Sequence, residues 1–208
     1  MLHFLQPFEA PPRPITLEAE WKLHQTNNQT HLSLIYRLRG ALNEIHLPVE
    51  PLLSSQSRAH ELWKDTCFEW FLKTNSKTQY WEFNIAPTGQ WNFYELSDYR
   101  SNLQESPLIS ACQLRSEVHS IPTSKNHSDN SVHEASQLDE KGFGVYSLYF
   151  NASLHSFFNQ PTEIQCQWSM ALTAVIRWKS GQTSYYSLQH PKDKPDFHHP
   201  AGFQVSLP

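Results

Sequence analysis

The sequence is poor in charged residues and in the glycines that build many catalytic loops. Only 17% of its 208 residues are Asp, Glu, Lys or Arg, where about 25% is usual, and it has 6 glycines and 2 methionines. It contains no glycine-rich phosphate loop, no G-x-S-x-G motif and no H-E-x-x-H motif. We therefore expect no enzyme that depends on these motifs.

The chain also lacks an excess of positive charge and any long apolar run. Its net charge is −4 and its isoelectric point is near 6.3, so nothing favours binding to nucleic acid or to an anionic membrane. No stretch approaches the ~18 apolar residues of a membrane helix. The beginning, MLHFLQPFEAPPRP, has neither the basic nor the apolar region of a signal peptide, which predicts a cytoplasmic protein.

Cysteine is scarce as well. Cys67, Cys112 and Cys166 are odd in number and widely spaced, which argues against a disulfide framework. No Cys/His pattern has the spacing of a zinc site, so we expect buried thiols and no metal.

Aromatic residues are abundant, at 13% of the chain, and they follow the two-residue period of β-strands. The segment 31–38 places Leu32, Leu34, Tyr36 and Leu38 on one face. Two aromatic runs around the turn at 87–90 predict a hairpin. The strands expected are 31–38, 67–72, 80–86, 91–96, 110–118, 144–150, 164–178 and 183–189.

No segment of 11 or more residues has helical periodicity. Short strands with turn signals between them predict an all-β protein, a two-layer antiparallel β-sandwich of immunoglobulin or jelly-roll type, in a single domain over 1–208. The segment 119–141 has no aromatic residue and is rich in Ser, Asn and His. We expect it to be a flexible insertion, with a domain boundary as the alternative.

Two long blocks of sequence resemble one known family. The first is LWKDTCFEWFL at 62–72, continued by YWEFNIAPTGQW at 80–91 and by Tyr94, Tyr99 and Arg100. The second is SYYSLQHP at 184–191, followed by KPDFHHP at 194–200. In this order they resemble the DOMON-like proteins related to family 9 carbohydrate-binding modules, over roughly 17–207.

The resemblance implies a β-sandwich in which one concave sheet holds a ligand. That ligand is a sugar in the carbohydrate-binding modules and a haem in some cytochrome-like relatives. Haem needs axial ligands, and Met170 is in phase with Trp168 and Leu172, as a core residue would be. A haem-binding redox domain is therefore an alternative that depends on histidines alone, and we expect no cofactor.

Two of the expected strands, 67–72 and 80–86, are mostly apolar and should be buried, but each contains polar residues. Glu82 and Asn84 share a face of 80–86, and Glu69 lies on the more polar face of 67–72. If these strands are neighbours, the three side chains converge. A buried carboxylate needs a partner, and the candidates are Arg100, Arg177 and His190.

Sugar recognition combines aromatic faces with groups that bind hydroxyls. The faces could come from Trp63, Trp91, Tyr94 and Tyr186, although each of them could equally belong to the core. Near the end of the chain, Asp196 and His198 could make local hydrogen bonds in a rigid turn or contact a ligand. The candidate ligand-binding residues are Trp63, Glu69, Glu82, Asn84, Trp91, Tyr94, Arg100, Arg177, Tyr186, His190, Asp196 and His198.

We therefore predict a non-catalytic module that binds a carbohydrate or another small polar ligand. One alternative is a structural or protein-interaction domain in which an internal polar network satisfies the glutamates. A glycosidase that uses Glu69 and Glu82 as its pair of catalytic carboxyl groups is a further alternative. The sequence leaves the oligomeric state open.

Overall fold

The computed structural model describes residues 1–48, 52–54, 57–120, 138–139, 142–158 and 167–207. Strands dominate this part of the chain, and its α-helix, α1 (His155–Phe158), is a single turn. The strands are β1 (Leu2–Pro7), β2 (Ile15–Thr26), β3 (Gln29–Ala41), β4 (Cys67–Thr74), β5 (Tyr80–Ile85), β6 (Trp91–Leu96), β7 (Gln104–Glu105), β8 (Gln113–Ser120), β9 (Phe143–Ser153), β10 (Trp168–Arg177), β11 (Thr183–Ser187) and β12 (Val205–Leu207).

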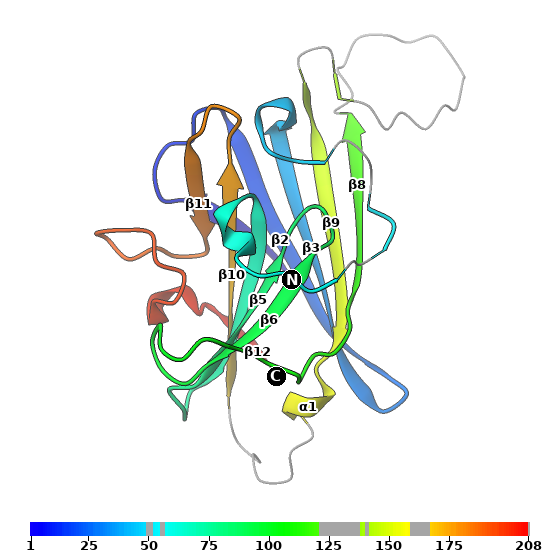
Figure 1. The fold of residues 1–208 in the computed structure, drawn as a ribbon, viewed down its shortest axis with the longest axis vertical. Helices are drawn as coiled ribbons and strands as arrows, with labels where there is room; N and C mark the ends of the chain where they lie inside the picture. The colour runs from blue at the N-terminus through cyan, green and yellow to red at the C-terminus, as the bar shows by residue number, and fades with distance from the viewer. Residues whose placement is uncertain (49–51, 55–56, 121–137, 140–141, 159–166, 208) are drawn as a thin grey trace.

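The strands form one continuously paired and curled antiparallel sheet (Figure 1). Its order is β7-β6-β5-β4-β10-β11-β1-β2-β3-β9-β8, and β12 pairs with β10 beside this path. Strand β1 connects the two halves, because it pairs with β11 through Gln6 and Pro7 and with β2 through Leu2 to Leu5. The nearly all-β, antiparallel architecture is confirmed, while the finer expectation of two separate layers stays a prediction.

Most of the expected strands occur where the sequence placed them, and the hairpin at 87–90 joins β5 to β6 with Ile85 opposite Trp91. Strands β1, β2, β7 and β12 were not predicted from the sequence. Strand β2 does carry a signal, because Ile15, Leu17 and Ala19 alternate with polar residues. Cys166 and most of the expected insertion (121–137 and 140–141) lie outside the described residues.

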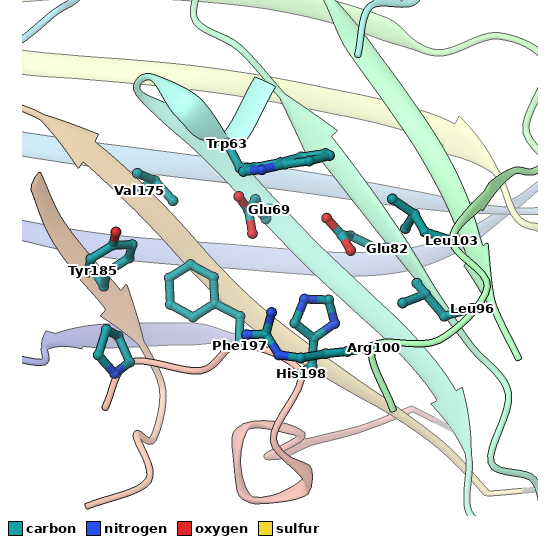
Figure 2. Close-up of a pocket in the computed structure, with 11 residues that line it drawn as sticks. Trp63, Glu69, Glu82, Leu96, Arg100, Leu103, Val175, Tyr185, Phe197 and His198 are labelled. Carbon is teal, nitrogen blue, oxygen red and sulfur yellow. The ribbon is translucent and has the colours of Figure 1, made fainter. Parts of the chain in front are cut away.

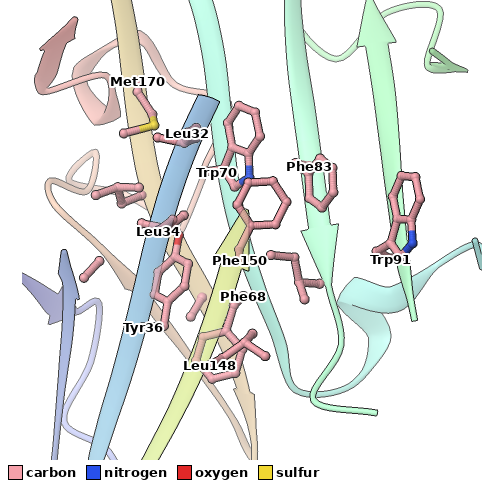
Figure 3. Close-up of a cluster of buried hydrophobic side chains, with 14 of the residues drawn as sticks. Leu32, Leu34, Tyr36, Phe68, Trp70, Phe83, Trp91, Leu148, Phe150 and Met170 are labelled. Carbon is pink, nitrogen blue, oxygen red and sulfur yellow. The ribbon is translucent and has the colours of Figure 1, made fainter. Parts of the chain in front are cut away.

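Aromatic side chains fill the interior between the two halves of the sheet (Figure 3). The Trp70 and Phe83 rings stack with their centroids 5.3 Å apart, and both contact Phe150 from β9. Tyr36 on β3 packs on Phe68 of β4, with ring centroids 5.2 Å apart. Burying each such side chain contributes about 1.5–3 kcal/mol, so strands β4 and β5 are held mainly from this inner face.

One polar contact crosses the interior and holds the strand that carries the candidate site. The Tyr36 hydroxyl donates a hydrogen bond to the backbone carbonyl of Glu69. Both groups are buried, so losing the hydroxyl would leave a carbonyl oxygen without this donor. The contact ties the position of Glu69 to the opposite half of the sheet.

We expect Phe83→Ala to lower the free energy of unfolding by about 3–5 kcal/mol, because Phe83 is fully buried among other aromatic rings. Phe4→Ala is the matched control: Phe4 is 57% exposed, and we expect a change within about 0.5 kcal/mol. Urea unfolding followed by tryptophan fluorescence measures both, and equal losses would contradict the assignment of the core.

Candidate functional site

A pocket of about 320 Å³ lies on the face of the sheet opposite the aromatic core (Figure 2). Strands β4, β5, β6 and β10 build its floor, and loops near residues 63, 100 and 197 surround it. It is lined by Trp63, Glu69, Glu82, Leu96, Arg100, Leu103, Val175, Tyr185, Pro195, Phe197 and His198.

Strand alternation places the two glutamates on this floor. On β4, Phe68 and Trp70 face the core, so Glu69 between them faces the pocket. Strands β4 and β5 pair with Glu69 opposite Asn84, which makes Glu69 and Glu82 diagonal neighbours on the same face. The two strands are therefore neighbours, as the convergence of these side chains required.

A row of buried polar residues crosses five strands beneath the pocket. Each member lies directly opposite the next in the strand register, and all of them are buried. The row consists of Ser187, Thr173, Glu69, Asn84 and Asn92. Burying a polar side chain costs free energy unless the side chain makes hydrogen bonds. A row of five such residues in the middle of the sheet is therefore a candidate site for binding a polar ligand.

The row satisfies its members only in part. The Asn84 side chain donates to Glu82 Oε1 at 2.7 Å, and the Thr173 hydroxyl donates to Glu69 Oε2 at 3.5 Å, the limit of a hydrogen bond. Within the described residues, Glu69 Oε1 and Asn84 Oδ1 are buried and receive no donor. Two acceptor oxygens at this face of the sheet are thus left without a donor in the described part of the chain.

Both glutamates hold their protons unusually tightly. Burial raises the pKa of Glu69 well above its ordinary value, and the neighbouring Glu82 raises it further. Burial also raises the pKa of Glu82 to about 7, although the hydrogen bond from Asn84 and the charge of Arg100 lower it in part. Glu82 is therefore partly protonated near neutral pH.

An ion pair between Arg100 and Asp196 lies on the side of the pocket opposite the glutamates. Arg100 Nη2 lies 2.8 Å from Asp196 Oδ1, and the Tyr99 hydroxyl donates to the second carboxylate oxygen. Burial opposes the charge of Asp196, but the hydrogen bonds from Tyr99 and Arg100 outweigh it and hold the Asp196 pKa below its ordinary value. Only 3% of the Asp196 side chain is exposed, whereas 50% of the Arg100 side chain is.

His198 is held in place as a neutral ring. Its Nδ1 lies 2.7 Å from the Tyr80 hydroxyl, which accepts a hydrogen bond from the backbone N–H of Arg100. Burial and the Arg100 charge lower the pKa of His198 to about 4. Tyr80 and His198 thus form a hydrogen bond between two neutral groups.

Trp63 forms an aromatic wall next to the carboxylates, as Figure 2 shows. It lies in a single 3-10 turn, Leu62–Lys64, and is half-buried. Its ring meets Tyr94 of β6 edge-on, with centroids 6.0 Å apart. The contact with Tyr94 orients the indole while leaving part of it accessible.

The structure brings together most of the candidate residues but not all of them. Five line the pocket: Trp63, Glu69, Glu82, Arg100 and His198. Three lie directly behind these residues and contact them: Asn84, Tyr94 and Asp196.

The remaining four lie away from the pocket lining. Trp91 and Tyr186 are in the core, where Trp91 stacks on Phe83. Arg177 donates to Thr183 Oγ1, and His190 Nε2 contacts the carbonyl of Gln6. These four side chains pack in the core or make hydrogen bonds elsewhere in the fold, and they do not form the pocket surface.

Sequence reasoning missed several residues of the lining. Phe197 stands beside Asp196 and His198 in the KPDFHHP block, and Tyr185 lies opposite Val175 in the pairing of β11 with β10. Alternation could have found Tyr185, since it faces away from the core residue Tyr186. Leu96, Leu103 and Pro195 carry no sequence signal for a site.

Within the described residues, no group of three or more His, Cys, Asp or Glu side chains is arranged to hold a metal ion. No helix in this part of the chain is both long and apolar enough to span a bilayer.

One solved structure has a fold similar to that of this chain. It is from Bacteroides uniformis ATCC 8492 and is described as "a putative carbohydrate-binding protein". The TM-score is 0.53 and the sequence identity is 13%, over 96% of this chain and 83% of that chain. No protein-family model and no curated protein matches the sequence. At this identity the likeness shows the fold alone.

We expect Glu82→Gln to change the pH dependence of stability. A carboxyl group with a raised pKa stabilises the folded protein at low pH and loses that contribution as pH rises from about 4.5 to about 7. Relative to the variant, the wild type should therefore lose on the order of 1–3 kcal/mol between pH 5 and pH 8. Chemical denaturation at a series of pH values measures this difference.

The comparison with the variant is needed because His198 acts in the opposite direction. Its lowered pKa makes the protein more stable as pH rises from about 4 to about 6.5. This contribution is present in both proteins and cancels in the difference. Glu20→Gln on β2, where 46% of the Glu20 side chain is exposed, is the control for loss of one charge. A wild-type-minus-Glu82→Gln difference that stays constant from pH 5 to pH 8 would contradict the buried state of Glu82.

Proposed function

We propose that this protein is a non-catalytic carbohydrate-binding module of DOMON-like, two-layer type and that the pocket over Glu69 and Glu82 is its binding site. The likeness of its fold to a protein described as carbohydrate-binding supports this. The resemblance to family 9 carbohydrate-binding modules supports it too, because both blocks of that resemblance contribute to one pocket. The first block supplies Trp63, Glu69 and Glu82, and the second supplies Phe197 and His198.

The pocket combines the two kinds of surface that a sugar ring requires. Trp63 offers an aromatic face for the C–H groups of the ring, while the glutamates, Arg100 and His198 offer partners for hydroxyls. A volume of about 320 Å³ lies at the small end of the usual range of ligand sites, roughly 300–1,000 Å³. It suits one or two sugar units.

The observation that carries the proposal is the buried oxygen Glu69 Oε1, which has no donor among the described residues. A buried acceptor left unpaired costs roughly 1–3 kcal/mol. A sugar hydroxyl that donates to this oxygen would remove the cost. A purely structural or protein-interaction role would instead predict that the glutamates are satisfied inside the protein.

The arrangement of the glutamates favours binding over hydrolysis. A glycosidase places its two carboxyl groups on either side of the bond that breaks. Glu69 and Glu82 project from adjacent strands on the same face of one sheet, so both meet a ligand from the same side. With 2% and 5% exposure they form a floor rather than two facing walls.

Titration with a panel of mono- and disaccharides, followed by calorimetry and tryptophan fluorescence, tests the proposal. We expect saturable binding that Trp63→Ala weakens about tenfold or more, which corresponds to about 1.4 kcal/mol, because the stacking face is lost. Trp21→Ala is the matched control: Trp21 is a half-buried tryptophan on β2, outside the pocket lining, and its loss should leave affinity unchanged. Flat titrations across the panel, or equal losses in both variants, would overturn the proposal.

A further inference from the structure

We infer that the pocket selects a sugar that carries a positively charged amino group, with the ammonium bound between Glu69 and Glu82. This inference rests on the proposed function and names the class of sugar that the site prefers. It follows from three features: the charges around the pocket, the balance of donors and acceptors on its floor, and the aromatic rings beside it.

Within the part of the chain that the structure describes, the two carboxyls on the pocket floor have no cationic partner of their own. Arg100 is the permanently charged cation in the lining, and Asp196 already neutralises it through hydrogen bonds from Nε at 3.3 Å and Nη2 at 2.8 Å. His198 is held neutral by burial and by Arg100. Glu69 and Glu82 are therefore left without a cationic partner of their own within the described residues.

The groups that surround the two carboxyls supply no further positive charge. Glu69 is faced by the Cys67 thiol and the Thr173 hydroxyl. Glu82 is faced by Asn84, by Tyr94 directly opposite on β6, and by Tyr80 on its own strand. The phenols and the thiol are neutral because burial raises the pKa of each of them.

The donor balance points the same way. Two buried acceptors receive no hydrogen bond within the described residues: Glu69 Oε1 on the floor and Asn84 Oδ1 directly behind it. An ammonium group provides three N–H donors and no acceptor, so it can donate to an oxygen that has no donor of its own. It would also bring a positive charge to two carboxyls that otherwise keep protons in order to remain buried.

The walls of the pocket suit a cation as well. Trp63 and Phe197 both line it, and aromatic faces attract ammonium groups. A neutral sugar can stack on Trp63 and donate hydroxyl hydrogen bonds to the carboxyls, but it brings no positive charge to them. The combination of a stacking ring with an uncompensated pair of carboxyls therefore discriminates between charged and neutral sugars.

Calorimetry at pH 7 with matched sugar pairs tests the inference. The pairs are glucosamine with glucose, galactosamine with galactose and mannosamine with mannose, and the N-acetylated sugars serve as uncharged analogues. We expect at least one amino sugar to bind about tenfold or more tightly than its parent and its N-acetylated form. Glu69→Gln should abolish this preference, whereas Glu20→Gln, which removes one charge from β2, should keep it.

A second measurement needs no variant. An ammonium that favours the ionised carboxyls should displace protons, so the binding enthalpy of the amino sugar should differ between two buffers of different ionisation enthalpy, neither of them a primary amine. The neutral parent sugar should release fewer protons. Glu82→Gln should reduce the release by the amino sugar, and a merely structural role of Glu82 would not affect it.

The outcomes separate the two proposals. Equal or tighter binding of the neutral sugars overturns the preference for amino sugars and leaves the carbohydrate-binding proposal standing. Failure of every sugar in the panel, charged or neutral, overturns both. Tighter binding of Ca²⁺ alone than of any amino sugar also overturns the inference, because the two carboxyls would then serve a metal ion.

Discussion

The pairing of β4 with β5 is the constraint on which both the core and the pocket depend. Its register places Trp70 opposite Phe83 on one face and Glu69 opposite Asn84 on the other. Successive side chains of a strand alternate between the two faces of the sheet. The pairing that stacks the aromatic rings on the inner face therefore also brings the polar groups together on the opposite face. A shift by one residue would reverse both faces, so the register of the site is enforced by the energy of the core.

Both faces of these strands are buried, and this is what makes the pocket chemically unusual. In most antiparallel sheets one face packs on the core and the other is solvated. Here the second face is covered by the loop segments that carry Trp63, Arg100 and Phe197, so its carboxyls are removed from water without being paired with cations. Burial raises the pKa of Glu69 and of Glu82, whereas Asp196, which accepts hydrogen bonds from Tyr99 and Arg100, keeps its charge. Three carboxyls in one small region thus behave in two different ways, because Asp196 receives hydrogen bonds from Tyr99 and Arg100 and is less deeply buried.

The network around Asp196 links the closing segment of the chain to the pocket. The Asp196 carboxylate accepts hydrogen bonds from Arg100 and from the backbone N–H of His198, and His198 contacts Tyr80. The turn around Asp196 therefore makes the local hydrogen bonds expected of a rigid turn, and it also forms one wall of the candidate site. The two roles that the sequence analysis treated as alternatives for this cluster are compatible, because one carboxylate with several acceptor positions serves both.

Alternation of apolar and polar residues was enough to predict an all-β antiparallel protein, the hairpin of β5 and β6, and a common face for Glu82 and Asn84, because these properties depend on the local period of a strand. It did not distinguish Trp63, which lines the pocket, from Trp91, which stacks on Phe83 in the core, since both are aromatic residues at the edge of a strand or turn. Only the tertiary structure decided which carboxyl received Arg100 and which were left without a cation. Such pairings join residues about a hundred positions apart, and they depend on how the loops close over the sheet rather than on any pattern along the chain.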